Sequence, residues 1–268
     1  MSAIRTNNPL LRPEIFEPRG GGRFGNFAVA ERGNVMTIQG TVNVMFILMG
    51  LTIASAVMVW TLLQQSPMLY GVTIGGSLLA LVLTLVCSFK PKISPYVGWL
   101  IAICEGALAG GLSVIWSKYA ARNDAPEAVS SLGTGLVLQA LLLTGGIAVG
   151  LLLAYKTRLI RATENFKLGV FAATAGICFV SLGSMVLNMF GVQVPYIWGS
   201  GIIGIGFAGF VVVTAALNLV LDFDYIEQGA ANQLPKHMEW YAGIGLLVTL
   251  VWLYVSILRL LAKLADRR

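Results

Sequence analysis

The 268-residue chain is 57% hydrophobic and only 11% charged, whereas about 25% of the residues of an ordinary soluble domain are charged. This composition excludes a soluble globular protein and indicates an integral membrane protein. The net charge is +6, but the basic residues lie between apolar runs rather than on one amphipathic face. That placement is typical of loops that face anionic lipid headgroups, and it does not favour nucleic-acid binding.

Residues 1–40 contain no apolar run long enough to pack, and their basic residues are five arginines, Arg5, Arg12, Arg19, Arg23 and Arg32. We expect a basic, mostly disordered arm on the cytoplasmic side of the membrane. The first apolar run begins only after Gly40, which is too late for the apolar core of a signal peptide. The first span is therefore expected to be retained.

Crossing about 30 Å of hydrocarbon takes about 20 apolar residues. Seven runs of this length follow the arm and predict an all-α membrane domain over residues 41–268. The predicted spans are residues 42–62, 68–89, 96–116, 129–155, 168–190, 201–221 and 240–261. All nine prolines lie outside these runs, so no proline kink is expected.

The distribution of basic residues predicts the orientation in the membrane. With a cytoplasmic N-terminus, the cytoplasmic segments carry twelve Lys and Arg residues and the opposite side carries six. Against the positive-inside tendency, an odd number of spans leaves outside four of those six, Arg259, Lys263, Arg267 and Arg268. The seventh segment is therefore expected either to span the membrane or to re-enter it. The expected location is a bacterial cytoplasmic (inner) membrane.

Glu105 lies near the middle of the third predicted span. An ionisable side chain at this depth costs at least about 2.5 kcal/mol, so it needs a partner or a function. Ala102, Gly106 and Gly110 form a small-residue face on the same helix, which allows another helix to approach closely. Two interpretations of Glu105 are open, an interhelix contact and a position on an ion path.

The sixth predicted span ends in three acidic residues, Asp222, Asp224 and Glu227. Thr214, Asn218 and Asp222 recur at every fourth residue and form a narrow stripe of oxygen-bearing side chains. Asp222 and Asp224 are about 200° apart on a helix. We expect Asp222 to face inward and Asp224 to meet water or basic loop residues. A solvated helix end is the structural alternative for all three carboxylates.

The seventh predicted span carries a small or polar face that is expected to point into protein. This face is formed, at steps of three or four residues, by Gly245, Thr249, Trp252, Ser256 and Arg259. Glu239 lies at the start of the span, where the helix dipole favours a carboxylate. Capping and a place on the ion path are both open for Glu239.

Enzyme chemistry is not expected. The single histidine, His237, lies beside Lys236 in a loop, and the sequence offers no triad around it. The sequence contains no nucleophile elbow, metal-binding motif or nucleotide-binding loop, and its three cysteines lie in apolar runs without metal-ligand spacing. We therefore expect no catalytic residues and no cofactor.

Three short segments carry a family signature: Glu-Gly-Ala-Leu-Ala-Gly at 105–110, Asp-Phe-Asp-Tyr-Ile at 222–226 and Leu-Tyr-Val-Ser-Ile-Leu-Arg at 253–259. Together they resemble the Bax inhibitor family of small membrane proteins, in a bacterial branch, over roughly residues 40–264. The resemblance implies a fold in which a central seventh helix is surrounded by the other six. It also implies activity as a pH-sensitive calcium leak.

The resemblance further implies a gate in which an Asp of the sixth helix pairs with an Asp of the seventh, and protonation of the pair controls opening. Asp222 matches the first position, whereas Thr249 occupies the second and Trp252 replaces a nearby Asn. The pair is therefore incomplete, and the partners left for Asp222 are Thr249, Glu105, Asp224 and Glu239. Lys90 corresponds to a basic residue that follows the second helix in the family.

The leading hypothesis is a pH-modulated passive leak of cations, with calcium as the ion. The path is expected to be lined by Asp222, Asp224, Glu105, Asn218, Thr249 and Glu239. Asp222 would provide only a weak, transient calcium site, which suits conduction. The alternative is a non-conducting regulator that binds membrane-protein partners such as a quality-control protease or a stress-response protein. A third possibility is a proton-coupled transporter that uses Glu105 and Asp222.

Overall fold

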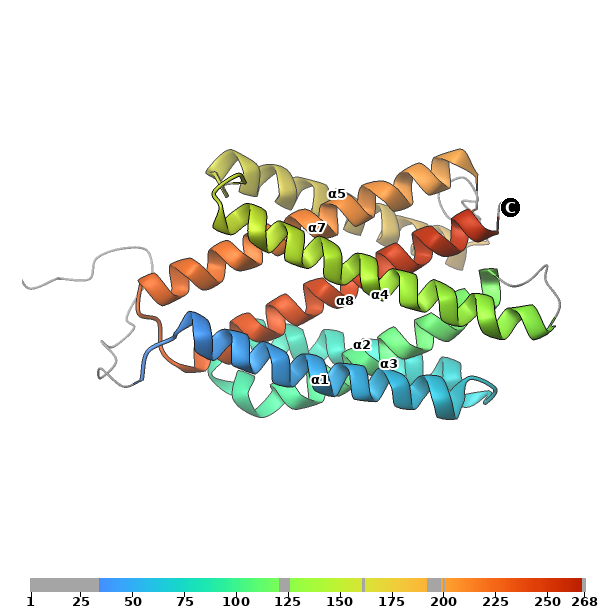
Figure 1. The fold of residues 1–268 in the computed structure, drawn as a ribbon, viewed down its shortest axis with the longest axis horizontal. Coiled ribbons are helices and arrows are strands. Elements are labelled where there is room, and N and C mark those ends of the chain that lie inside the picture. Colours follow the sequence, from blue (N-terminus) through green and yellow to red (C-terminus); the bar gives the residue numbers. More distant parts are fainter. Residues whose placement is uncertain (1–33, 121–125, 161, 192–198, 200, 267–268) are drawn as a thin grey trace, which may run out of the picture.

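The computed structural model describes residues 34–120, 126–160, 162–191, 199 and 201–266, and these residues form an all-α bundle (Figure 1). Seven of the helices are long and apolar enough to cross a membrane, which confirms the predicted fold class. The elements are α1 Ile38–Leu63, α2 Met68–Phe89, the short 3-10 helix η3 Pro91–Ile93, α3 Ser94–Ala120, α4 Pro126–Lys156, α5 Glu164–Met189, α7 Ile202–Ala231 and α8 His237–Ala265.

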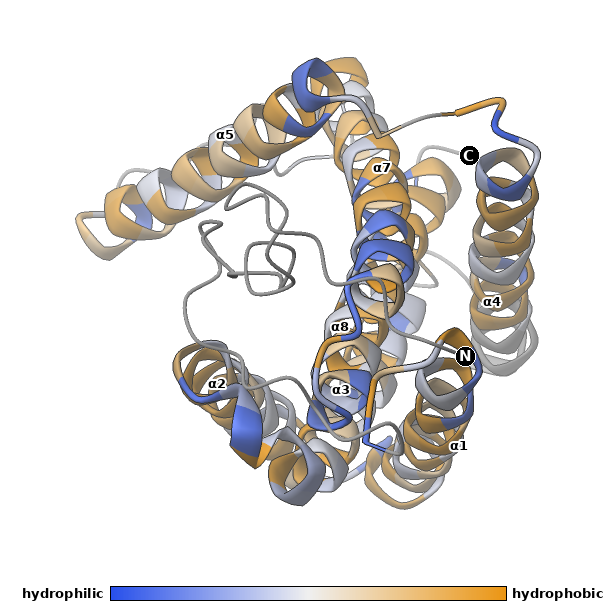
Figure 2. Cartoon of the chain, turned by 90° about the vertical axis from the view of Figure 1, so that its left-hand side faces the viewer, coloured by the Kyte–Doolittle hydropathy of each residue, from blue (hydrophilic) through white to orange (hydrophobic). Residues whose placement is uncertain are grey.

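The last helix, α8, lies in the middle of the bundle and packs against α1, α3, α4 and α7 (Figure 2). In the apolar windows of the helices, 56% of the residues are buried in α8 and 61% in its neighbour α3, compared with 17% in α2, α4 and α5. The expected central position of the seventh span is therefore confirmed. The other six helices do not surround it equally, because α2 packs mainly on α3 and α5 packs on α7.

Two helices extend beyond the predicted spans. Helix α7 continues through the three acidic residues as far as Ala231, so the acidic segment is helical and not a frayed end. Helix α8 is a continuous helix of 29 residues, and at about 1.5 Å per residue it is longer than the about 30 Å of hydrocarbon. It is therefore long and apolar enough to cross the membrane as one helix. The described ends of the chain lie at opposite ends of the bundle (Figure 1).

The predicted arm lies mostly outside the described residues, which begin at Asn34. The last residues of the predicted arm are held against the connection between α7 and α8. Val35 forms an antiparallel bridge with Pro235, and the Met36 amide donates to the carbonyl of Leu234 at 2.7 Å. The Met36 side chain is buried and lies against Gly229 of α7. Residues 38–40 belong to α1, so the helical domain begins before the predicted boundary at residue 40.

Helices α1 and α3 pack closely through the small-residue face of α3. The Thr52 hydroxyl of α1 donates to the carbonyl of Ala102 at 3.0 Å, and the Ser55 hydroxyl donates to the carbonyl of Ile103 at 2.8 Å. A Cβ atom on Gly110 would lie 2.9 Å from the Cα of Ala56, which is closer than packed carbon atoms approach each other. The absence of a side chain at Gly110 therefore permits this close contact between α1 and α3.

We expect Gly110→Leu to disrupt the α1–α3 contact, because backbone atoms of α1 cannot move aside for a side chain. The expected loss is about 3 kcal/mol, the upper end of the usual cost of overpacking. It can be measured as a lower thermal midpoint and a lower yield of monodisperse protein in detergent. The matched control is Gly146→Leu in α4, where an added Cβ would meet no atom within 4 Å. Equal stability of the two variants would contradict this account of the packing.

Candidate functional site

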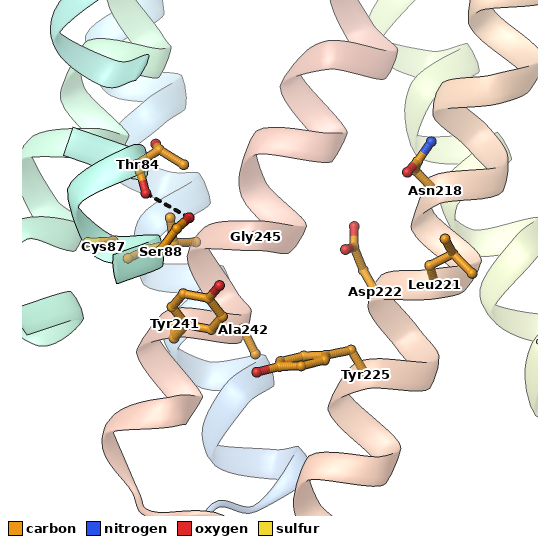
Figure 3. A pocket seen from close by; sticks show the side chains of 11 residues that line it. Thr84, Cys87, Ser88, Asn218, Leu221, Asp222, Tyr225, Tyr241, Ala242 and Gly245 are labelled. Atoms are coloured by element: carbon orange, nitrogen blue, oxygen red, sulfur yellow. Dashed lines mark hydrogen bonds between the residues drawn. The ribbon is translucent and has the colours of Figure 1, made fainter. Parts of the chain in front are cut away.

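A cavity of about 380 Å³ lies between α2, α7 and α8, near the end of the bundle where α1 begins (Figure 3). Helix α2 contributes hydroxyl groups and a thiol, α7 contributes the polar stripe, and α8 contributes small residues and a tyrosine. The lining residues are Thr84, Cys87, Ser88, Asn218, Leu221, Asp222, Tyr225, Tyr241, Ala242, Ile244 and Gly245.

The Asp222 carboxylate points from α7 into this cavity (Figure 3). Its Oδ2 atom is buried and has no hydrogen-bond partner among the described residues. The side chain that interacts with this carboxylate is the Thr249 hydroxyl of α8, which also donates to the carbonyl of Gly245 in its own helix at 3.2 Å. The structure therefore brings together two of the predicted site residues, Asp222 and Thr249.

Asn218 lies one helical turn before Asp222 and also lines the cavity. Its amide nitrogen donates to the Thr174 hydroxyl of α5 and to the carbonyl of Thr214, both at 2.9 Å. Since the nitrogen is used in these contacts, the amide oxygen remains on the cavity side (Figure 3). Thr214 is buried and bonds to its own helix, so the stripe supplies two residues to the cavity rather than three.

Asp224 and Glu227 face away from the cavity. Asp224 pairs with Lys167 of α5 at 3.0 Å and accepts a hydrogen bond from Tyr155 of α4 at 3.3 Å. Glu227 accepts from the same Tyr155 hydroxyl. These carboxylates therefore join α7 to α4 and α5, as the 200° separation on the helix requires for Asp224. Asp224 is not brought together with Asp222.

Glu105 is 6% exposed and does not line the cavity. It lies seven residues after Gly98, which contacts Ile244 and Trp240 of α8. It also lies eight residues before Ser113, whose hydroxyl shares a hydrogen bond of 2.7 Å with Tyr254 of α8. Because residues seven or eight apart share a helix face, Glu105 belongs to the interface between α3 and α8.

Glu239 caps a helix, but not its own. Its Oε1 atom accepts hydrogen bonds from the amide and the hydroxyl of Thr37, both at 2.9 Å. Thr37 is the N-cap of α1, and its hydroxyl in turn accepts from the Gly40 amide at 2.9 Å. A Cβ on Gly40 would meet the carboxylate of Glu239, so glycine leaves room for this contact. Glu239 therefore fastens α1 to α8 and lies outside the Asp222 cavity.

Two basic residues are held at the far end of α8. Lys263 is 2% exposed, and its ammonium group donates to the carbonyl of Gly204 at the start of α7, at 3.2 Å. The Arg259 guanidinium lies 5.6 Å from the ring centroid of Trp116. Both side chains are engaged within the protein, so neither counts as a loop charge facing lipid headgroups. The predicted polar face of the seventh span ended at Arg259. Lys263 lies four residues later and so extends the same face by one helical turn.

Sequence reasoning missed part of the cavity. Thr84 and Ser88 lie in α2, which reads as uniformly apolar, and Tyr241 was not among the expected site residues. The rings of Tyr225 and Tyr241 lie 6.2 Å apart at the cavity. The i+3 step from Asp222 to Tyr225 on α7 is the sequence signal that could have identified Tyr225. The α2 residues carry no such signal, because their place depends on how α2 packs.

The cavity contains little that could hold a metal ion tightly. Among the described residues, no group of three or more His, Cys, Asp or Glu side chains could bind a metal. Asp222 is the single carboxylate in the cavity lining. Calcium prefers six to eight oxygen ligands, so a calcium ion would depend on Asp222, the Asn218 oxygen, hydroxyl groups and water.

A family model described as Bax inhibitor 1 like matches residues 8–266 of this chain. The chain belongs to the Bax inhibitor 1 like family. This confirms the family that the three sequence segments indicated. No curated protein and no solved structure matches the chain.

In this Bax inhibitor 1 like chain, Thr249 lies beside the carboxylate of Asp222. The resemblance implies an Asp at this position, and the structure brings Thr249 to the Asp222 carboxylate. Thr249 therefore lies where the resemblance implies the partner of Asp222, and it offers a hydroxyl group rather than an acid. One carboxylate, rather than two coupled ones, carries the charge in this cavity.

We expect Glu239→Ala to lower the free energy of unfolding by about 1.5–3 kcal/mol, because two hydrogen bonds to a buried carboxylate are lost. The measurement is thermal or denaturant unfolding in detergent. Glu164→Ala is the matched control, since this side chain is 90% exposed, and exposed ion pairs contribute about 0–1 kcal/mol. A Glu239→Ala variant as stable as the parent would show that the α1–α8 link is not structural.

Proposed function

We propose that this Bax inhibitor 1 like protein is a passive, pH-modulated cation leak, with calcium as the transported ion. The observation that carries the proposal is the buried Oδ2 atom of Asp222, which has no hydrogen-bond partner in the part of the chain that the structure describes and lies in a cavity of a membrane-spanning bundle. A charged group at membrane depth costs at least about 2.5 kcal/mol. A cation in the cavity would offset this cost.

The chemistry of the cavity favours weak binding. One carboxylate, one amide oxygen and a few hydroxyl groups supply fewer ligands than a calcium buffer protein offers. An ion that enters such a site can also leave it, which conduction requires. Weak coordination therefore supports a leak rather than a storage site.

The described conformation is the closed form of this leak. Beyond the cavity, α8 continues through Leu247, Leu250 and Leu253, which are 0%, 6% and 0% exposed. These side chains belong to the main apolar core of the bundle. A dry apolar constriction stops ions because it excludes their water. Opening therefore requires the helices around α8 to separate at this level.

The orientation follows from the basic residues at the cavity end of the bundle. This end carries the connections α2–α3, α4–α5 and α7–α8, with Lys90, Lys92, Lys156, Arg158, Lys167 and Lys236. At the other end, Arg259 and Lys263 make contacts within the protein. The positive-inside tendency then assigns the cavity end to the cytoplasm, in the expected bacterial inner membrane. Asp222 is thus reached from the cytoplasmic side.

The pH dependence has a defined sign. The titratable groups that line the cavity with Asp222 are Cys87 of α2, Tyr225 of α7 and Tyr241 of α8, and no other charged side chain lines it among the described residues. Lowering the pH protonates the carboxylate and removes the charge that attracts the cation. Calcium flux therefore falls as the pH falls.

We expect Asp222→Asn to lower calcium flux in proteoliposomes by about tenfold or more and to abolish its pH dependence. Two unit charges about 4 Å apart attract each other by about 4 kcal/mol at an effective dielectric constant of about 20, and the amide lacks this attraction. The measurement is calcium entry, followed with a trapped dye, from mildly acidic to mildly alkaline pH. Glu227→Gln is the control, because it removes the same charge from α7 outside the cavity. Identical flux and pH response in parent and Asp222→Asn would refute the mechanism.

We expect Gly245→Leu to block the leak without unfolding the protein. Gly245 lines the cavity, and an added Cβ would meet no atom within 4 Å. The new side chain would therefore occupy the cavity, and leucine is also a better helix former than glycine by about 1 kcal/mol. Calcium flux and thermal midpoint are both measured. Gly206→Leu in α7 is the control, since its position is equally open but lies outside the cavity. Undiminished flux in Gly245→Leu would exclude this cavity from the route.

The second candidate function is a non-conducting regulator that binds membrane partners. The specific observation in its favour is the positive charge of Arg259 and Lys263 at the far end of α8, because cations leaving the bundle there would be repelled. This function is tested by measuring calcium flux through the parent protein itself. Flux no greater than that of empty vesicles at every pH, with the protein folded in the same vesicles, would favour the regulator over the leak.

A further inference from the structure

The cavity has the size and surface of a small-molecule site. Pockets for small ligands occupy about 300–1,000 Å³ and combine apolar walls with a few placed polar groups, and this cavity measures about 380 Å³. Leu221 and Ile244 provide apolar wall, and the rings of Tyr225 and Tyr241 lie 6.2 Å apart beside them. A hydrated metal ion makes no use of such walls, whereas an organic ligand does.

Two buried polar atoms of the cavity lack partners and come from different helices. They are Oδ2 of Asp222 on α7 and Oγ1 of Thr84 on α2, and neither has a hydrogen-bond partner among the described residues. Figure 3 shows them on opposite sides of the cavity, with α8 between them. A buried polar atom without a partner costs about 1–3 kcal/mol, and more when it is charged. A ligand that donates hydrogen bonds would therefore satisfy the carboxylate directly.

The charge of the cavity narrows the class of ligand. A carboxylate repels anions, and a neutral ligand cannot compensate its charge. Calcium prefers six to eight oxygen ligands, so one carboxylate and its neighbours would hold it only weakly. An organic ammonium ion meets each requirement, because its N–H groups donate to Asp222, aromatic faces attract the cation, and its carbon body contacts the apolar wall.

We propose that the Asp222 cavity is a binding site for a primary organic ammonium ion with an apolar body. The ammonium group donates to Oδ2 of Asp222 and to the Asn218 oxygen, and the apolar body packs against Leu221, Ile244 and the two tyrosine rings. This inference rests on the proposed function in one respect, that the cavity receives positive charge. It does not require that any ion crosses the membrane.

The binding experiment uses 2-phenylethylamine as the probe and 2-phenylethanol as its neutral counterpart, with purified full-length protein in a non-ionic detergent at mildly alkaline pH. Calorimetry is expected to show saturable binding of the amine and at least about tenfold weaker binding of the alcohol. Both probes enter micelles, and micelles without protein correct for this. Equal affinity for the amine and the alcohol would overturn the proposal.

Three variants locate the binding. Asp222→Asn is expected to weaken amine binding by about tenfold or more, because the charge-assisted hydrogen bond is lost. Gly245→Leu is expected to abolish it by filling the cavity, which keeps the test valid if Asp222→Asn fails to fold. Glu227→Gln, with the same loss of charge outside the cavity, is expected to bind as the parent does. Amine binding that persists in Asp222→Asn or in Gly245→Leu would assign the amine to another site.

Failure of the ammonium site and failure of the leak have different signatures. One outcome would overturn the leak and support the ammonium site. In that outcome, amine binding is saturable and depends on Asp222, whereas calcium flux is the same in the parent and in Asp222→Asn. Asp222-dependent flux without amine binding would do the reverse. If both hold, the amine is expected to inhibit calcium flux in the parent at the concentrations at which it binds.

Discussion

A charged side chain inside hydrocarbon costs at least about 2.5 kcal/mol unless the protein compensates it, and this constraint accounts for the positions of the ionisable residues along α7 and α8. Lys263 reaches a backbone carbonyl of α7, Glu239 reaches the first turn of α1, and Asp224 pairs with Lys167 of α5. The first contact joins α8 to α7, and the other two tie this helix pair to α1 and α5. Asp222 differs, because one of its carboxylate oxygens lies buried in a cavity and has no hydrogen-bond partner in the described ranges of the chain.

The wall of that cavity is connected to the edge of the bundle through Asn218. Its amide nitrogen bonds to Thr174 of α5, and α5 is otherwise attached to α7 by the ion pair between Lys167 and Asp224. Helix α5 packs on α7 and is among the most exposed helices. A shift of α5 would therefore move Asn218, which contacts Thr174 of α5 and also lines the cavity. Polar residues of α7 thus attach α5 on the outer face of the helix and line the cavity on its inner face.

Thr249, rather than the acid that the family resemblance implies, lies beside the Asp222 carboxylate, and this determines how the carboxylate titrates. Two carboxylates close together share protons, and their titration belongs to the pair. A carboxylate beside a hydroxyl group titrates as a single site, so its charge is either present or absent. A cavity with one negative charge, two tyrosine rings and apolar walls suits the binding of a single positive charge, and it would hold a doubly charged metal only weakly. The proposed ammonium site follows from this lining.

The sequence by itself determined the class of fold, the seven spans and the close approach to the small-residue face of α3. Length and hydropathy of each segment are local properties, and hydrocarbon admits little besides helices. Helical periodicity also separated Asp222 from Asp224. Only the tertiary structure decided that Glu239 caps α1, about two hundred residues away, and that α2 completes the cavity with Thr84. The spans are apolar on most sides, so their patterns do not define which face meets which neighbour, and that choice depends on packing between helices far apart in the chain.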